Sequence, residues 1–540
     1  MKKSVQYAAG LLACAALLSG CATTGASSTK TTSAAKKGGI QTATVQDRQR
    51  TVITTDGEVD DMNSVLRALL YANEMDIAGI VITSSMYHYA GDAEKGIEPF
   101  RWTGTDWIWK FLDDYETVYP NLITHADGYP TADSLRAVTK IGNISNKGEM
   151  EQVTEGSEFL KELFLDDDPR TLYVQTWGGT NTTARALKSI EESYAGTPEW
   201  QSVQDKINAK VVLYIILDQD ESYAQYIAKS WPGITILNDR SNFWHFAYAW
   251  QYHSDELNSR LKGEWTYPNL VQDKGALMAN YALMGDGDWL DGELPEEQRG
   301  SDAYMAANPN YQQYDFISEG DSPSFLYLID TGLRSLEDPS FGGWGGRFGA
   351  VQSAAGTVYN NSVLDYDPYT GQYEAQYTLS RWFDVLQEDF AARADWCVLD
   401  KKAANHNPSV SVVQGIDVSA APGETVTLTA SGTDPDGDSL SYQWWRYAEA
   451  DTYQDIADPE PDVDFRVGGD DGMLLNVTRA LAADETPAGN IALSGADTET
   501  VTFTVPEDAR PGDTIHLVVT VTDDGAHNLV HYQRVIVTVR

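Results

Sequence analysis

The pattern of apolar and polar residues changes its character near residue 402. Before this point, short and almost uniformly apolar runs alternate with stretches whose apolar residues recur at helical spacing. Fully apolar strands separated by helices are typical of a mainly parallel sheet with helices on both faces. After it, apolar and polar residues alternate between turns rich in proline and glycine, which predicts an immunoglobulin-like β-sandwich. The sequence therefore predicts an α/β domain over 48–402 and an all-β domain over 403–540.

The predicted elements of the first domain alternate between strand and helix. Strands are expected at 51–55, 75–83, 170–176, 210–216 and 234–237, and helices at 62–70, 102–115, 157–165 and 182–194. The segment 121–135 is expected to be rich in loops. In the second domain, an acidic insertion at about 450–495 interrupts strands that are expected at 409–413, 424–430, 440–447, 500–505, 514–522 and 530–539.

The first predicted strand leads directly into an acidic turn. Asp56, Glu58, Asp60 and Asp61 lie within six positions, and an apolar helical stripe follows them. The carboxyl ends of parallel strands are where α/β sheets bind ligands, and crowded carboxylates repel one another unless a cation lies between them. Oxygen ligands at this spacing suit Ca²⁺ or Mg²⁺. Ordinary capping is the alternative, because acidic residues also stabilise the first turn of a helix.

Polar clusters occupy several other positions that follow predicted strands. They are Ser84–His88, Trp177–Asn181 and Asp218–Glu221, and a further cluster lies downstream at Ser318–Ser324. Because the ends of parallel strands converge on one edge of a sheet, these clusters together indicate a single site.

The composition narrows the class of ligand. The chain has 80 acidic and 38 basic residues, a net charge of −42, which argues against nucleic-acid binding because that needs a basic face. It also contains 15 Trp and 29 Tyr. Such rings stack on sugars, although packing in the core is their commoner use.

The N-terminus resembles a bacterial lipoprotein signal peptide. Lys2 and Lys3 precede an apolar run at 8–18, and Leu18-Ser-Gly-Cys21 matches a lipobox. Cleavage after residue 20 leaves Cys21 lipidated, followed by a flexible tether over 21–47. We therefore expect a cell-envelope lipoprotein, anchored by Cys21 in the outer membrane and facing the periplasm or the cell surface.

The acidic turn also carries a family resemblance. The segment from Thr54 to Asp61 resembles the Asp-rich fingerprint of the calcium-dependent nucleoside hydrolases. More closely, residues 48–540 resemble a secreted bacterial family that joins a nucleoside-hydrolase-like domain to a C-terminal β-domain and is named for cellulose binding. The other stretches that carry this resemblance are Ser84–His88, Trp177–Thr182, Glu319–Phe325 and Gly342–Arg347.

The resemblance implies roles for the matched residues. Asp56 would bind Ca²⁺ and activate the attacking water as the catalytic base. Asp61 and Asp321 would complete the calcium site, and Asp60 would contact the sugar. His88 occupies the position of a sugar-contacting Asn.

The remaining substrate-binding candidates have structural alternatives. Trp344 is a candidate sugar platform and Arg347 an anion clamp, although their glycine-rich segment is also a plausible tight turn. Trp177 and Asn181 follow a strand, where they also suit packing and helix capping. Glu319 stands where nucleoside hydrolases carry a His. In the second domain, alternation places one of the adjacent Trp444 and Trp445 in the core and the other outside, as a possible sugar-stacking residue.

Three departures from the nucleoside-hydrolase pattern leave two hypotheses open. Thr54 replaces the first Asp, Gly57-Glu58 replaces the usual Pro-Gly, and no His-Asp pair follows. The first hypothesis is a calcium-dependent hydrolase that acts on N-glycosidic or related glycoside bonds outside the cytoplasm. The second is a non-catalytic lipoprotein that binds cellulose or another carbohydrate on a hydrolase-like scaffold.

Overall fold

The computed structural model describes residues 48–540, apart from 289, 352–356, 454–461, 469–471 and 482–484. The predicted signal peptide (1–20), the lipidation site Cys21 and the rest of the tether lie outside the described residues. Among the described helices, none has both the length and the apolar character that a membrane span requires.

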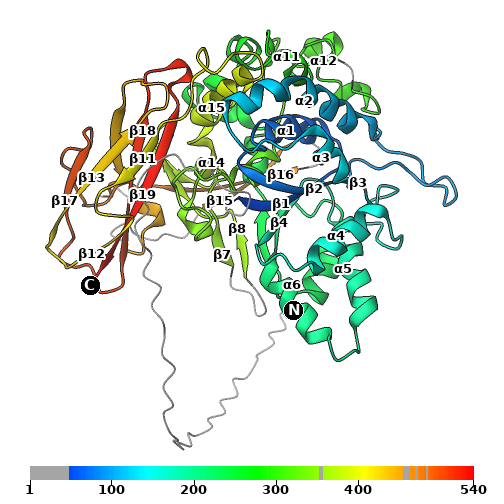
Figure 1. The fold of residues 1–540 in the computed structure, drawn as a ribbon, viewed down its shortest axis with the longest axis horizontal. Helices are drawn as coiled ribbons and strands as arrows, with labels where there is room; N and C mark the ends of the chain where they lie inside the picture. The colour runs from blue at the N-terminus through cyan, green and yellow to red at the C-terminus, as the bar shows by residue number, and fades with distance from the viewer. Residues whose placement is uncertain (1–47, 289, 352–356, 454–461, 469–471, 482–484) are drawn as a thin grey trace, which may run out of the picture. The chain divides into compact units, whose positions relative to one another are not determined.

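An eight-stranded sheet organises the first part of the chain (Figure 1). Its order is β3-β2-β1-β4-β5-β6-β8-β7, and all neighbouring pairs are parallel except β7 and β8. This arrangement confirms the predicted α/β fold. The bounds are β1 Gln49–Thr55, β2 Met75–Ile82, β3 Thr139–Ile141, β4 Leu172–Thr176, β5 Val211–Ile216, β6 Thr235–Asp239, β7 Gly349–Val351 and β8 Val358–Asn360.

Helices cover both faces of this sheet. On β1, Ile53 packs into the core with α1 and α2, whereas its neighbour Val52 packs into the core with α4, α5 and α6, as alternation along a strand requires. Figure 1 shows α1, α2 and α3 on the opposite side of the sheet from α4, α5 and α6. Their bounds are α1 Val59–Leu70, α2 Asp106–His125, α3 Ala132–Ala137, α4 Glu155–Leu165, α5 Asn181–Tyr194 and α6 Trp200–Lys210.

The expectation of a loop-rich segment over 121–135 is wrong in part. Helix α2 continues through Pro120 to His125, and α3 adds a second helix at Ala132–Ala137. The buried side chains of Val118 and Leu122 supply the reason, because packing against the core favours helix beyond the proline. Short helices follow from residue 228 onward: α7 Ala228–Ser230, α8 Asn242–His245, α9 Asp255–Asn258, α10 Gly263–Thr266, α11 Gly275–Met278, α12 Asp302–Ala307, α13 Ser322–Leu326 and α14 Tyr377–Ser380, before the longer α15 Phe383–Trp396.

The last part of the chain forms two β-sheets around a separate core. One sheet has the order β11-β13-β17 and the other β12-β19-β18-β14, and Trp444 lies in the core between them. The half-buried Trp445 packs instead against Trp382 and Arg381. The bounds are β11 Ser409–Val412, β12 Asp417–Ala420, β13 Thr425–Thr433, β14 Ser441–Arg446, β17 Thr500–Thr504, β18 Thr514–Thr522 and β19 Val530–Val539.

The acidic insertion contributes two strands to a third sheet. Its order is β15-β16-β10-β9, so β16 from the insertion pairs antiparallel with β10, which precedes α14 in the chain. The alternation of apolar and polar residues in the insertion does not predict that β16 pairs with β10, because β10 is only three residues long. The bounds are β9 Asp365–Asp367, β10 Gln372–Glu374, β15 Asp462–Gly468 and β16 Gly472–Ala480.

A fully buried ion pair fixes α1 against two distant segments. The Arg67 guanidinium contacts the Glu319 carboxylate twice, Nε to Oε2 at 2.5 Å and Nη2 to Oε1 at 2.9 Å. Its Nη1 also donates to the carbonyl of Leu386 on α15, at 3.0 Å. The guanidinium lies 3.9 Å from the ring centre of Phe390. Arg67 therefore ties together α1, α15 and the segment that precedes α13.

We expect Arg67→Met to lower the free energy of unfolding by about 3–5 kcal/mol, because it leaves the Glu319 carboxylate buried without a cationic partner. Urea unfolding at fixed pH measures this loss. The double variant Arg67→Met/Glu319→Gln should recover part of it, since no buried charge then remains. A loss below about 1 kcal/mol in the single variant would contradict this account of the pair.

His527, in the turn between β18 and β19, makes a second ion-paired link to α15. Its Nδ1 lies 3.0 Å from Glu388 Oε2 and its Nε2 3.1 Å from Asp395 Oδ2. Two carboxylates can be bonded in this way only if both ring nitrogens carry protons. Burial lowers the pKa of His527, but hydrogen bonds to the two carboxylates outweigh it and raise the pKa to about 9. Arg260 and Lys274 pair with the same carboxylates and keep them ionised.

This link should make stability depend on pH. Because the folded pKa of His527 is raised, its contribution is fully present below the unfolded pKa of about 6.5 and is lost as the pH rises towards 9. We expect the difference in unfolding free energy between the parent and His527→Gln to shrink by as much as about 3 kcal/mol between pH 6 and pH 9.5. Urea unfolding across this range measures the difference, and a constant difference would refute the assignment.

Candidate functional site

The acidic turn follows β1 at the carboxyl edge of the sheet and leads into α1. Gly57 adopts a φ of +81°, and a Cβ there would lie 2.9 Å from the indole nitrogen of Trp107, so the turn requires glycine. Glu58 then takes the N-cap position of α1 in an extended conformation, without a side-chain capping bond. The turn therefore places four carboxylates at one helix N-terminus, and capping by Glu58 does not explain them.

Four buried aspartates gather here, and we call Asp56, Asp60, Asp61 and Asp321 the aspartate cluster. Carboxylate oxygens of Asp60, Asp61 and Asp321 lie within 4.8 Å of one another. Asp56 lies beside this group, and its backbone N–H donates to Asp61 Oδ1 at 3.1 Å. The expected metal ligands were Asp56, Asp61 and Asp321. The structure groups Asp60 with the last two, since Asp60 and Asp61 are adjacent in the first turn of α1.

Among the described residues, no Lys or Arg side chain compensates the charge of the aspartate cluster. No Lys or Arg of the described chain forms an ion pair with any of its members, and both Asp321 carboxylate oxygens, Asp60 Oδ1 and Asp56 Oδ2 are buried without hydrogen-bond partners. Burial first, and then mutual repulsion, raises the pKa of Asp60, Asp61 and Asp321 well above the usual value. Burial likewise raises the pKa of Asp56. A hard divalent cation fits such a set of oxygen ligands.

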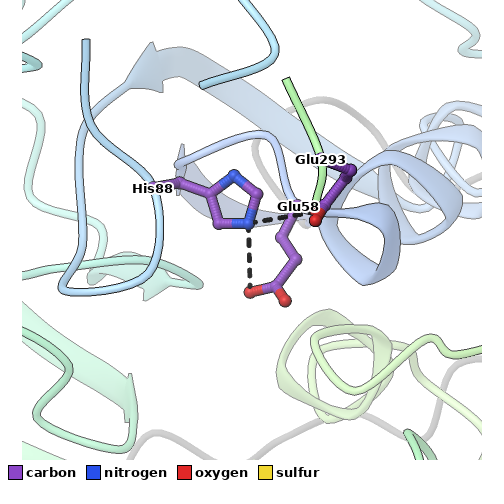
Figure 2. A group of neighbouring side chains, drawn as sticks. All are labelled: Glu58, His88 and Glu293. Carbon is purple, nitrogen blue, oxygen red and sulfur yellow. Dashed lines mark ion pairs between the residues drawn. The ribbon is translucent and has the colours of Figure 1, made fainter. Parts of the chain in front are cut away.

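A second group of charged side chains lies beside the acidic turn. We call Glu58, His88, Arg101 and Glu293 the Glu58 network. Figure 2 shows the imidazole of His88 directed at both carboxylates, with Nε2 at 3.3 Å from Glu293 Oε1 and 3.8 Å from Glu58 Oε2. Arg101 donates to Glu58 Oε1 at 3.1 Å and to both Glu293 oxygens, at 2.9 and 3.1 Å.

The Glu58 network is balanced in charge. Burial alone would raise the pKa of Glu58, but the charges of His88 and Arg101 lower it to about 2. Burial lowers the pKa of His88, and the neighbouring carboxylates raise it by more. Two carboxylates therefore face one guanidinium and one imidazole that readily holds a proton. The Glu58 network therefore contains its own cations, whereas the aspartate cluster has no Lys or Arg partner among the described residues.

Other predicted site residues are held by structural contacts. The Trp177 indole nitrogen donates to Ser324 Oγ at 2.7 Å. The Asn181 side chain is buried, where it donates to Ser84 Oγ at 3.0 Å. Glu319 is paired with Arg67, as described above. Their predicted substrate contacts stay predictions.

Trp344 and Arg347 are buried in a different environment. Arg347 donates to Asp365 Oδ1 and to the carbonyl of Leu364, each at 2.7 Å. The guanidinium is thus engaged by residues of and beside β9, and Trp344 belongs to the main hydrophobic core. The structure does not bring either residue into the aspartate cluster or the Glu58 network.

Sequence reasoning missed Arg101 and Glu293 and assigned no role to Glu58. Glu293 lies in a stretch of short helices and loops without a clear periodic pattern, so no local signal distinguishes it from other acidic residues. Arg101 has a φ of +47°, an unusual conformation for a non-glycine residue that tertiary contacts must hold. Both residues join the site only through contacts with residues that are distant in the sequence.

The fold and the acidic turn define a nucleoside-hydrolase-like protein, and family models confirm this class. The model described as "Cellulose-binding Sde182, nucleoside hydrolase-like domain" matches residues 50–348. The model described as "Cellulose-binding protein Sde0182, C-terminal domain" matches residues 425–539. The chain therefore belongs to the cellulose-binding Sde182 family, as its sequence indicated.

One solved structure agrees with this assignment. A nucleoside hydrolase-related hypothetical protein from Saccharophagus degradans, described as associated with carbohydrate metabolism, is 26% identical with a TM-score of 0.64. The alignment covers 91% of this chain and 100% of that one. A plant nucleoside hydrolase is 12% identical with a TM-score of 0.28, over 58% of this chain and 87% of its own, and this likeness is too low to support any inference. No curated protein matches the chain.

The substitution Asp321→Asn should change thermal stability in opposite directions with and without calcium. Without the ion, the variant should raise the thermal midpoint, because it removes one of the mutually repelling carboxylates. With millimolar Ca²⁺, the parent should gain about 2–4 kcal/mol from binding and the variant much less. Differential scanning calorimetry measures the midpoint with and without the ion.

Asp133→Asn, on the exposed face of α3, is the control and should behave as the parent does. A parent midpoint that Ca²⁺ leaves unchanged would show that the cluster holds no calcium.

Proposed function

We propose that this chain is a calcium-dependent glycoside hydrolase that cleaves N-glycosidic or related glycoside bonds outside the cytoplasm. The observation that carries the proposal is the aspartate cluster, whose buried carboxylates lack a cationic partner at the carboxyl edge of a nucleoside-hydrolase-like sheet. Asp60, Asp61 and Asp321 would hold the ion, with Asp56 beside them. A bound Ca²⁺ supplies Lewis acidity and a fixed positive charge at this edge.

The chain's own residues account for two parts of the reaction. Asp56 Oδ2 is buried without a hydrogen-bond partner, so it is free to take a proton from the attacking water as a general base. Glycosidic cleavage passes through a transition state with positive charge on the sugar ring. The ionised Glu58, together with the neighbouring carboxylates, stabilises that charge.

A non-catalytic carbohydrate-binding role is the second candidate. The description of the family as cellulose-binding favours it, as does the absence from the sequence of the His-Asp pair that nucleoside hydrolases carry. In either case, we propose a lipoprotein of the cell envelope, anchored through Cys21, with a boundary between its two domains near 402–403.

The catalytic proposal predicts that Asp56→Asn separates hydrolysis from ion binding. We expect the variant to lose about 100- to 10,000-fold in kcat, because it removes the general base, while its calcium affinity stays within about tenfold of the parent, because Asp56 is not one of the three grouped ligands. A panel of nucleosides and aryl glycosides measures turnover, and terbium luminescence measures ion binding.

Asp133→Asn serves again as the control and should keep full turnover. If the parent hydrolyses no member of the panel but sediments with cellulose, the hydrolase proposal fails and the carbohydrate-binding role replaces it. If Asp56→Asn retains parental kcat, Asp56 is not the base.

A further inference from the structure

Two buried histidines meet where the α/β part of the chain contacts the β-sandwich. His125 ends α2, and His406 lies just before β11. His125 Nδ1 lies 3.0 Å from His406 Nε2, and the two residues are 4% and 6% exposed. The ring centroids are 5.2 Å apart, close to the sum of the nitrogen–nitrogen distance and the two ring radii. The two nitrogens therefore face each other along the line between the rings, as in a hydrogen bond.

The outer nitrogens of this pair also have partners. His125 Nε2 lies 2.9 Å from the carbonyl oxygen of Leu399. His406 Nδ1 lies 3.1 and 3.0 Å from the two carboxylate oxygens of Asp436, in the turn between β13 and β14. The backbone N–H of His406 donates to the same carboxylate at 2.8 Å. The indole of Trp396 lies parallel to the His125 ring, with centroids 5.3 Å apart. These contacts hold both rings in one orientation.

The hydrogen bonds of the pair fix how many protons it carries. A carbonyl oxygen and an ionised carboxylate only accept hydrogen bonds, so His125 Nε2 and His406 Nδ1 must each carry a proton. The contact between the rings needs a third proton, on either of its nitrogens. Two neutral imidazoles hold only two protons. The pair therefore shares one extra proton and one positive charge, which lies beside the negative charge of Asp436, and it titrates as a unit.

The surrounding charges disfavour a second positive charge on the pair. The charged residues on the elements packed against it are Arg393 of α15, which lies over the Trp396 ring, Asp400 and Lys401 after α15, and Asp434 in the turn that carries Asp436. Burial lowers the pKa of His125, and the charges of His406 and Lys401 act in the same direction. Asp400 opposes them but ranks below both. His125 is therefore the ring that resists a further proton.

We propose that His125, His406 and Asp436 form a pH-sensitive joint that fastens the β-sandwich to α2 while the two imidazoles share one proton. Loss of this proton at alkaline pH leaves one of the three contacts without a hydrogen. A further proton at acidic pH leaves two N–H groups facing each other between the rings. Unfolded imidazoles titrate near pH 6.5. Below this pH the unfolded rings bind more protons than the folded pair, and above it fewer, so the joint stabilises the fold most near pH 6.5 and less on both sides.

Hydrogen exchange of the full chain tests this joint. Protection factors compare each observed rate with its intrinsic rate, which removes the pH dependence of exchange itself. We expect peptides that cover residues 399–408 to be at least about tenfold more protected near pH 6.5 than at about pH 4.5 or pH 9. In His406→Gln, the side-chain amide can still bond His125 Nδ1 but does not titrate, so these factors should change less than about twofold. Both proteins keep the His527 link, so the comparison isolates the joint.

Asp497→Asn, which changes an exposed acidic residue of the β-sandwich, is the control and should match the parent at each pH. Circular dichroism verifies that each variant is folded. Nitrogen-15 NMR of the imidazoles in the parent gives a second measurement that needs no folded variant of the joint. Near pH 6.5 it should find protons on both nitrogens of one ring, shared with its neighbour. Parent protection that is the same at all three pH values, the same pH dependence in His406→Gln, or two rings that titrate independently would each overturn the joint.

Discussion

Burial of negative charge without a cation is the constraint on which this site depends. Asp60, Asp61 and Asp321 bring carboxylates within 4.8 Å of one another in a region that solvent barely reaches. The positive end of the α1 dipole offsets only part of this charge. The repulsion among these carboxylates therefore makes the folded state less stable, and a bound divalent cation would remove this cost. Such an arrangement in a cleanly folded protein indicates function rather than stability.

The surrounding fold holds the carboxylates in place despite their repulsion. The Arg67–Glu319 pair joins α1 to the segment just before Asp321, so the two halves of the aspartate cluster are fastened a few residues from the carboxylates themselves. Asp61 is held further by Thr55 at the end of β1, whose hydroxyl donates to its carboxylate. The charge-balanced pair and the unbalanced cluster thus have different roles: the pair supplies rigidity, and the cluster is the proposed binding site.

The Glu58 network shows how this chain departs from the nucleoside-hydrolase fingerprint. Where that fingerprint has Gly, this chain places Glu58, a fifth negative charge near the aspartate cluster. His88 and Arg101 compensate it. The substitution therefore adds a fixed, ionised group at the accessible margin of the site. The added carboxylate is ionised and can accept hydrogen bonds there.

The sequence by itself determined the α/β and β-sandwich architecture, because apolar periodicity depends on local burial. It also identified the acidic turn, because Asp56, Asp60 and Asp61 are close in the chain. The structure groups Asp60 rather than Asp56 with Asp61 and Asp321, because the grouping depends on how the turn enters α1, and the predicted metal ligands stay a prediction. Glu293 and Arg101 were beyond sequence reasoning, since neither lies in a motif and both gain a role only through contacts across the fold. Only the tertiary structure decided which acidic residues have a cationic partner, because burial and charge compensation are properties of neighbours in space rather than in sequence.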